Sequence, residues 1–365
     1  MMKTTLTIVA LALATSVSAQ ESPLWMRYCA ISPDGSAVAF TYKGDIYTVP
    51  TTGGTARQLT TNAAFDTHPV WSPDSKQLAF CSNREGSMDV YVMQREGGTP
   101  RRLTTNSNSE TPIAFKDNNT VLYTSSIIPS AKSIIFANRM LPQVYEVGTN
   151  GSRPHLFSAL PMMDISIRPN GDLLYHDQKG YEDPWRKHHR SPITRDIWLR
   201  RGGKYTKLTN FNGEDRTPVW AAQGDTFYYL SEEDGTFNVY MRNIDGTGKQ
   251  QLTRHTTNPV RFLTAANNGT LCYGYDGEIY TLKQGEQPQK LKVNIVTDKI
   301  DTDLDRQTLF TGATEIALSP DGKELAFVLH GDVYVTSNNY RTTKQITDTP
   351  EQEREIQFAP DGRSI

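Results

Sequence analysis

The chain has few cysteines, almost no excess of charge and, after its first twenty residues, no long hydrophobic run. Its three cysteines (Cys29, Cys81 and Cys272) have no CxxC spacing and fit no disulfide framework, so we expect them to be small buried residues within strands. The 38 basic and 40 acidic residues give a net charge of −2. This balance argues against nucleic acid or an anionic membrane surface as the main partner.

The sequence also lacks the motifs that mark common active sites. It contains no GxSxG elbow, HExxH, P-loop or dinucleotide fingerprint. Single Ser, His and Asp residues are plentiful, but none is arranged as a recognisable triad. We therefore predict no catalytic residue, no cofactor and no metal site in this chain.

The first nineteen residues have the pattern of a secretory signal peptide. Lys3 provides a positive charge, residues 6–14 are apolar, and residues 17–19 are small. The apolar stretch is too short to span a membrane, and no cysteine follows it as a lipid anchor site. We expect cleavage near Ala19/Gln20 and a periplasmic or secreted protein without a membrane anchor.

What the sequence does contain is a repeat of about forty residues with four short strands, which is typical of β-propeller blades. The clearest copy, residues 69–104, reads PVWSPDSKQLAF, a loop, DVYVM, a Gly-Gly turn and RRLT. An aromatic residue ends the second strand of each copy and another lies in the third. The seven pairs are Phe40/Tyr47, Phe80/Tyr91, Tyr123/Tyr145, Tyr175/Trp198, Tyr229/Tyr240, Tyr273/Tyr280 and Phe327/Tyr334.

The spacing of the repeats predicts the domain organisation of an all-β protein. Six WD40-like repeats form a six-bladed propeller over residues 20–293, and a polar connector follows at 294–312. The pattern restarts at 313–365 with the first blade and a half of a second propeller. Since an eighth repeat opens at 356–365 without room for its second strand, we expect the sequence to be part of a longer protein.

Two expectations concern packing. The pattern gives blades 1 and 6 four strands each, so we expect the ring to close through side-chain packing alone, with no strand exchanged between its ends. Trp71 and Trp220 recur where a large side chain would fill the gap between neighbouring blades. We favour core packing over cofactor stacking for both.

Two long insertions between second and third strands are the candidate binding elements. They cover residues 125–142 in blade 3 and 177–195 in blade 4, and we expect them on the same face of the propeller. The candidate substrate-binding residues in them are Arg139, Arg186, Lys187, His188 and His189. Guanidinium groups suit a carboxylate, whereas the alternative is a solvated or interdomain loop. The two adjacent histidines point opposite ways on an extended segment, which argues against a metal site.

Several segments resemble secreted tricorn-type proteases, large serine peptidases of the S41 group. These are PLWMRYCAISPDGSAVAFTYKGDIYTVP (residues 23–50), RKHH (186–189) and TRDIW (194–198). The PVWSPD and SPDGKELAF units are WD40-like repeats that other families share. The resemblance covers nearly the whole mature chain, including the restart after six repeats.

This resemblance implies a six-bladed propeller, then a seven-bladed one, and then a PDZ-flanked catalytic core beyond Ile365. The propellers would act as channels and sieves for peptides or unfolded polypeptide segments, with the downstream catalytic and PDZ domains as partners in the same protein. In the family, basic residues of the first propeller anchor the substrate's carboxylate end. Arg139 is the nearest counterpart here, although Asn138 stands where a second basic residue is expected.

Two other families remain as alternatives at this point. One is a non-catalytic periplasmic binding or scaffold propeller of the TolB type, which has an α/β domain before its propeller. The other is the propeller half of a prolyl-oligopeptidase-like enzyme, which has a single larger propeller. Peptide preference and assembly, including a homo-oligomer, stay open.

Overall fold

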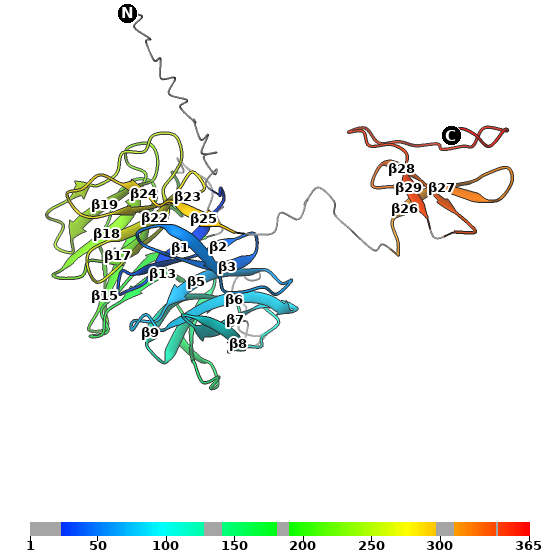
Figure 1. The fold of residues 1–365 in the computed structure, drawn as a ribbon. Helices are drawn as coiled ribbons and strands as arrows, with labels where there is room; N and C mark the ends of the chain where they lie inside the picture. The colour runs from blue at the N-terminus through cyan, green and yellow to red at the C-terminus, as the bar shows by residue number, and fades with distance from the viewer. Residues whose placement is uncertain (1–22, 128–140, 181–189, 297–309, 341) are drawn as a thin grey trace, which may run out of the picture. The chain divides into compact units, whose positions relative to one another are not determined.

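The computed structural model describes residues 23–127, 141–180, 190–296, 310–340 and 342–365, and every regular element in them is a β-strand. The chain divides into two compact units, Met1–Val296 and Thr297–Ile365 (Figure 1). Within the described ranges, no helix is long and apolar enough to cross a membrane. The predicted signal peptide lies outside the described residues.

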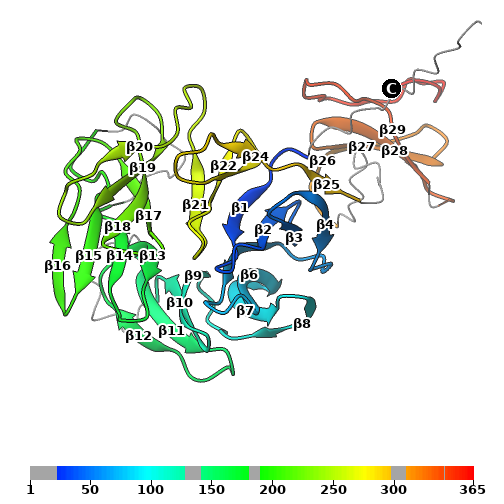
Figure 2. The ribbon, with the colours of Figure 1, turned by 60° about the vertical axis from the view of Figure 1, so that its left-hand side comes forward.

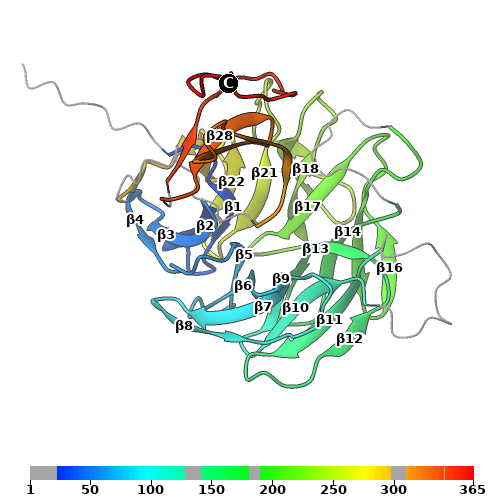
Figure 3. The ribbon, with the colours of Figure 1, turned by 90° about the vertical axis from the view of Figure 1, so that its right-hand side faces the viewer.

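Unit 1 contains six sheets, each built on four consecutive antiparallel strands, which are arranged as blades around a centre (Figure 3). The strands of blades 1 to 3 are β1 (Arg27–Ile31), β2 (Ala37–Tyr42), β3 (Asp45–Pro50), β4 (Gly54–Gln58), β5 (Asp66–Trp71), β6 (Gln77–Glu85), β7 (Ser87–Gln94), β8 (Gly97–Arg102), β9 (Glu110–Asp117), β10 (Thr120–Ser125), β11 (Gln143–Gly148) and β12 (His155–Ser158). Those of blades 4 to 6 are β13 (Met162–Ile167), β14 (Leu173–Asp177), β15 (Ile197–Arg201), β16 (Lys204–Lys207), β17 (Asp215–Trp220), β18 (Thr226–Ser231), β19 (Asn238–Asn243), β20 (Gln250–Gln251), β21 (Arg261–Ala265), β22 (Leu271–Tyr275), β23 (Glu278–Leu282) and β24 (Gln289–Lys290).

The aromatic pairs predicted from the repeats are register partners in the sheets. All seven face each other directly across the second and third strands. In blade 2, for example, the rings of Phe80 and Tyr91 stack with their centroids 5.8 Å apart. Cross-strand aromatic contacts stabilise a sheet and fix its register, so this part of the prediction is confirmed.

In five of the seven sheets, a threonine that follows the outermost strand accepts a hydrogen bond from the backbone of the third strand. The Thr60 hydroxyl accepts the backbone N–H of Ile46 at 2.9 Å, and Thr104 accepts that of Val90 at the same distance. The same contact recurs at Thr209, Thr253 and Thr347. The Leu-Thr or Ile-Thr pair that ends most repeats therefore has a structural role, because the hydroxyl satisfies an amide that the short fourth strand cannot reach.

Large buried side chains fill the spaces between blades, as expected for the two tryptophans. Trp71 is 6% exposed, and its indole N–H donates to the Ala30 carbonyl of the preceding blade at 2.9 Å. Trp220 is 7% exposed, and its backbone N–H donates to Ser166 Oγ in blade 4 at 3.1 Å. The three cysteines are free and buried, which confirms that prediction too.

The expectation that side-chain packing alone closes the ring is wrong. A short strand, β25 (Val293–Ile295), follows blade 6 and pairs in parallel with β4, so the sheet of blade 1 has five strands (Figure 2). The Gly54 N–H also donates to the Lys292 carbonyl at 2.8 Å. The outer edge of β4 had unpaired backbone groups, and a strand from the other end of the ring satisfies them.

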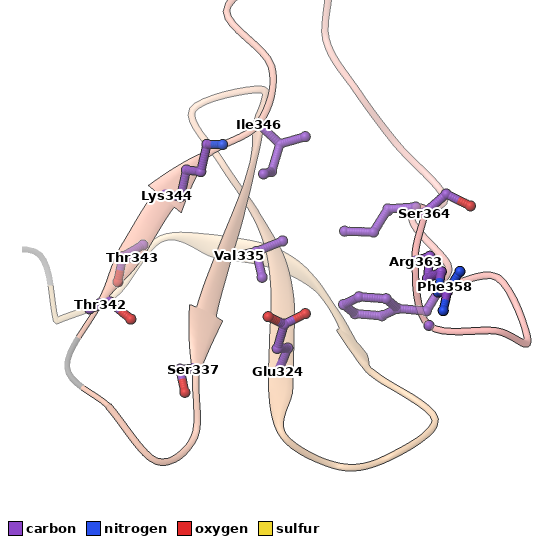
Figure 4. A pocket seen from close by; sticks show the side chains of 12 residues that line it. Glu324, Val335, Ser337, Thr342, Thr343, Lys344, Ile346, Phe358, Arg363 and Ser364 are labelled. Atoms are coloured by element: carbon purple, nitrogen blue, oxygen red, sulfur yellow. The ribbon is translucent and has the colours of Figure 1, made fainter.

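Unit 2 contains one antiparallel sheet of four strands, β26 (Ala313–Leu318), β27 (Glu324–Leu329), β28 (Asp332–Ser337) and β29 (Thr343–Gln345). Residues 356–365, predicted to open an eighth repeat with a strand, form no strand, and the Ile356 N–H donates to the Glu315 carboxylate instead. Phe358 from this segment lines a cavity of about 400 Å³ together with Val335 and Ile346 (Figure 4).

Candidate functional site

The innermost strands of the six blades surround a central cavity of about 750 Å³. Its lining includes residues from all six of these strands, β1, β5, β9, β13, β17 and β21, which lie around the centre of the ring (Figure 3). Each of them is the edge strand of its sheet. The cavity is therefore bordered by six strand edges and by the side chains that those strands direct inward.

One position of the inner strand has an unusual backbone in five of the six blades. Each inner strand contains a β-bulge, and in every blade but the third a non-glycine residue at the bulge has positive φ. The five are Tyr28 (52°), His68 (55°), Asp164 (49°), Thr217 (50°) and Phe262 (59°), and all line the cavity. Such a conformation costs about 1–3 kcal/mol, and it persists where surrounding structure imposes it, often at functional sites.

The cavity wall formed by blades 6, 1 and 2 is aromatic. The Tyr28 ring lies 3.7 Å from the His68 ring and 4.7 Å from the Phe262 ring, measured between centroids. Burial lowers the pKa of His68 to about 4. The imidazole is therefore neutral at physiological pH, so the three rings carry no formal charge, and Arg261 of blade 6 lines the cavity beside them.

The opposite wall, formed by blades 4 and 5, is polar. The Thr217 hydroxyl donates to Asp164 Oδ2 at 2.7 Å, and the Thr217 backbone N–H donates to His176 Nδ1 at 3.3 Å. Burial, and then the guanidinium groups of Arg195 and Arg216, lower the pKa of His176 well below its usual value. Its contact with Asp164, 3.6 Å from Nδ1 to Oδ2, is thus made by a neutral ring.

Asp164 itself has a raised pKa. Burial in the middle of the propeller is the main cause, and the Thr217 hydroxyl and the two guanidinium groups oppose it. The 45% of the side chain that is accessible faces the central cavity. The carboxyl group therefore holds its proton to a higher pH than an exposed aspartate.

Two arginines that also line the cavity share one carboxylate. Arg216 Nε lies 2.8 Å and Arg195 Nη1 lies 3.7 Å from Glu214 Oε2. The side chains of both arginines are 8% exposed and that of Glu214 is fully buried. Ion pairs removed from water hold their partners in fixed positions, because separating them would leave a buried charge unpaired.

The arrangement contains a cysteine and a histidine in contact, but it is not a catalytic dyad. Cys81 Sγ lies 3.8 Å from His68 Nδ1. Burial raises the pKa of Cys81 to about 12, whereas it lowers that of His68 to about 4. A reactive pair needs the opposite shifts, toward thiolate and imidazolium. In the described ranges no group of three or more metal-ligating side chains is present either.

The binding residues predicted from the sequence fall in segments that the structure does not describe. Arg139, Arg186, Lys187, His188 and His189 lie outside the described residues. The blade 4 insertion is described only at its ends, where Lys179 Nζ lies 2.5 Å from Asp196 Oδ2 and where Arg195 reaches the cavity.

Sequence reasoning missed the cavity residues for a physical reason. They lie at the second or third residue of their inner strands, but their side chains are chemically unlike one another. A usable signal was the Thr-x-Pro or x-Thr-Pro pattern at Pro69, Pro112 and Pro218, since proline inside a strand indicates an edge or a bulge.

The sequence is similar to those of known tricorn protease propellers. A family model described as the tricorn protease N-terminal beta propeller domain matches residues 23–288. Tricorn protease homolog 1 of Streptomyces coelicolor is 28% identical over 295 residues, which cover 78% of this chain and 26% of that relative. Tricorn protease of Thermoplasma volcanium is 24% identical over 229 residues, covering 61% of this chain and 20% of that relative.

A solved structure, the crystal structure of the tricorn protease, has the same fold with a TM-score of 0.68 at 18% identity. The match covers 90% of this chain and 32% of that chain. This chain thus spans about a quarter of the length of the curated relatives named above. The family model decides among the three families that the sequence left open: the chain belongs to the tricorn protease N-terminal β-propeller domains.

Proposed function

We propose that this chain is the N-terminal part of a tricorn-like serine peptidase, and that its propeller is a channel and sieve for peptides or unfolded polypeptide segments. The central cavity carries the proposal, because a space of about 750 Å³ bordered by all six blades can hold a stretch of extended chain and no folded domain. In this proposal, catalysis belongs to a serine peptidase core beyond Ile365.

The inner strand edges favour passage over permanent binding. An exposed strand edge pairs readily with an extended peptide. Here Pro69, Pro112 and Pro218 lack a backbone N–H, and bulges interrupt the edges. A peptide in the cavity would therefore contact side chains, aromatic on one wall and polar on the other, without joining a sheet.

The remaining parts of the proposal concern the whole protein. A second propeller would cover the exposed apolar side chains of β26, where Ile316 is 67% and Leu318 is 59% exposed. Catalytic and PDZ domains would follow it, and the signal peptide would direct the protein to the periplasm or the medium.

We also propose that the two insertions recognise the carboxylate end of a peptide, with Arg139 as the main contact. A charge-assisted hydrogen bond is worth roughly 1.5–3 kcal/mol. In the full-length protein, Arg139→Ala should therefore weaken the binding of free-acid peptides about tenfold to a hundredfold. The binding of C-terminally amidated peptides should stay nearly unchanged. Equal weakening of both forms would mean that Arg139 supports the loop and does not bind the carboxylate.

A bulky residue in the cavity tests the channel. Thr111 of blade 3 lines the cavity, whereas Thr206 is exposed on the outer strand β16. Binding of a fluorescent unstructured peptide should be lost in Thr111→Trp and kept in Thr206→Trp, as measured by anisotropy. Unchanged binding in both variants would place the peptide elsewhere on the propeller.

A further inference from the structure

The first and last blades bring two cysteines together that are far apart in the sequence. Cys29 lies on β1 and Cys272 on β22, and both belong to one hydrophobic cluster that spans the seam between blades 1 and 6. They are 1% and 0% exposed. The Cys29 thiol donates to the carbonyl of Phe262 on β21, the strand next to β22, at 3.7 Å, and it is close enough to Cys272 to raise the pKa of that thiol.

We propose that Cys29 and Cys272 are a redox modification site, and that a disulfide oxidant converts them to a disulfide that joins the first blade to the last. Neither the sequence spacing nor the family assignment indicates this pair. Cys81 is excluded, because it lies in blade 2 with its thiol 3.5 Å from the Thr67 carbonyl.

The reaction is an exchange of disulfides. One cysteine thiolate attacks a disulfide such as oxidised glutathione, forms a mixed disulfide and releases the first glutathione thiolate. The second cysteine then attacks the protein sulfur of that mixed disulfide and releases the second glutathione. The two cysteines lose two electrons and two protons, and both glutathione molecules leave as thiols.

The closed ring resists this reaction. Burial, and then the neighbouring Cys29 thiol, raise the pKa of Cys272 well above its usual value, so almost no thiolate is present. Oxidation therefore takes place while the seam is open, either during folding or after β25 (Val293–Ile295) has left β4. Once formed, the disulfide closes a loop of about 240 residues, and long loops gain most from such a link.

Refolding of the purified chain tests the proposal. The reduced, unfolded chain is refolded with oxidised and reduced glutathione, alkylated in denaturant and digested for mass spectrometry. We expect a Cys29–Cys272 linked peptide and an alkylated Cys81. The proposal is overturned if all three cysteines are alkylated, or if the linked peptide contains Cys81.

The melting temperature provides a second readout. The oxidised wild type should melt roughly 5–10 °C above its reduced form. Cys272→Ala should remove this difference, whereas the matched control Cys81→Ala should retain it, whatever either substitution does to the reduced protein. A difference that survives in Cys272→Ala would contradict a link through that residue.

Discussion

At the scale of single residues, Glu110 is the carboxyl group whose ionisation is most directly coupled to stability near neutral pH. It opens β9 and is 1% exposed. Burial raises its pKa to about 7, against a hydrogen bond from Thr104, and the nearby Asp89 carboxylate raises it further. Asp89 has its own partner in Arg102, whose Nη2 lies 2.8 Å away.

The raised pKa of Glu110 predicts that the folded protein loses stability as the pH rises. The folded protein binds this proton more tightly than the unfolded chain, where the pKa is 4.5, so the stabilisation is present below pH 4.5 and is lost as the pH rises through 7. At about 1.4 kcal/mol per pKa unit, the wild type should lose roughly 2–3 kcal/mol between pH 5 and pH 8 from this group. Glu110→Gln stays neutral, so its stability relative to the wild type should rise by that amount.

Urea unfolding at the two pH values measures the difference. Glu96→Gln is the control, because that side chain is 77% exposed and its surface ion pair with Arg57 should contribute little to stability. If the difference between Glu110→Gln and the wild type does not change with pH, Glu110 is ionised in the folded protein.

At the scale of elements, β25 is the strand that closes the ring. Asn294 lies opposite Thr55 at its centre. Asn294→Pro removes the backbone N–H and should weaken the pairing, whereas Asn294→Ala keeps it. We expect amide hydrogen exchange in β4 to accelerate at least tenfold in Asn294→Pro, most clearly at Gly54, and to be unchanged in Asn294→Ala. Equal protection in both variants would mean that side-chain packing closes the ring by itself.

The strands of the blades could be predicted from the sequence, whereas β25 could not. Pairs such as Phe40/Tyr47 recur in every repeat, so the number of sheets and their register followed from the pattern. A parallel strand of three residues has no alternation to detect. The bulge residues Tyr28 and Phe262 have conformations that their side chains disfavour, and only the assembled ring imposes them.

The same limit applies to the candidate site. The long basic insertions were visible because they interrupt a repeat, but Arg139 and its neighbours in blade 4 lie outside the described residues. Residues of the central cavity come from six separate repeats, and local sequence does not reveal which of them meet. The proximity of Cys29 and Cys272 could not be predicted from the sequence either, since ring closure alone makes them neighbours.

At the scale of the whole molecule, the two units should differ in stability. Unit 1 buries its blades against one another, whereas in unit 2 Phe310 is 92%, Tyr340 is 73% and Ile316 is 67% exposed. Limited proteolysis of the purified chain should therefore leave a fragment that ends near Val296 and remove the segment after it first. Mass spectrometry of the fragments decides, and early cuts between the blades of unit 1 would contradict the division.

The central claim is that a peptide enters the cavity of the propeller, and photo-crosslinking tests it most directly. A benzophenone amino acid placed at Phe262 lies on the cavity wall, and one at Tyr205 lies on the outer strand β16, where the native side chain is 44% exposed. Each variant is irradiated with a labelled unstructured peptide, and the adducts are mapped by mass spectrometry. The account predicts adducts from position 262 and few from position 205. Adducts only from position 205, or equal amounts from both, would contradict it.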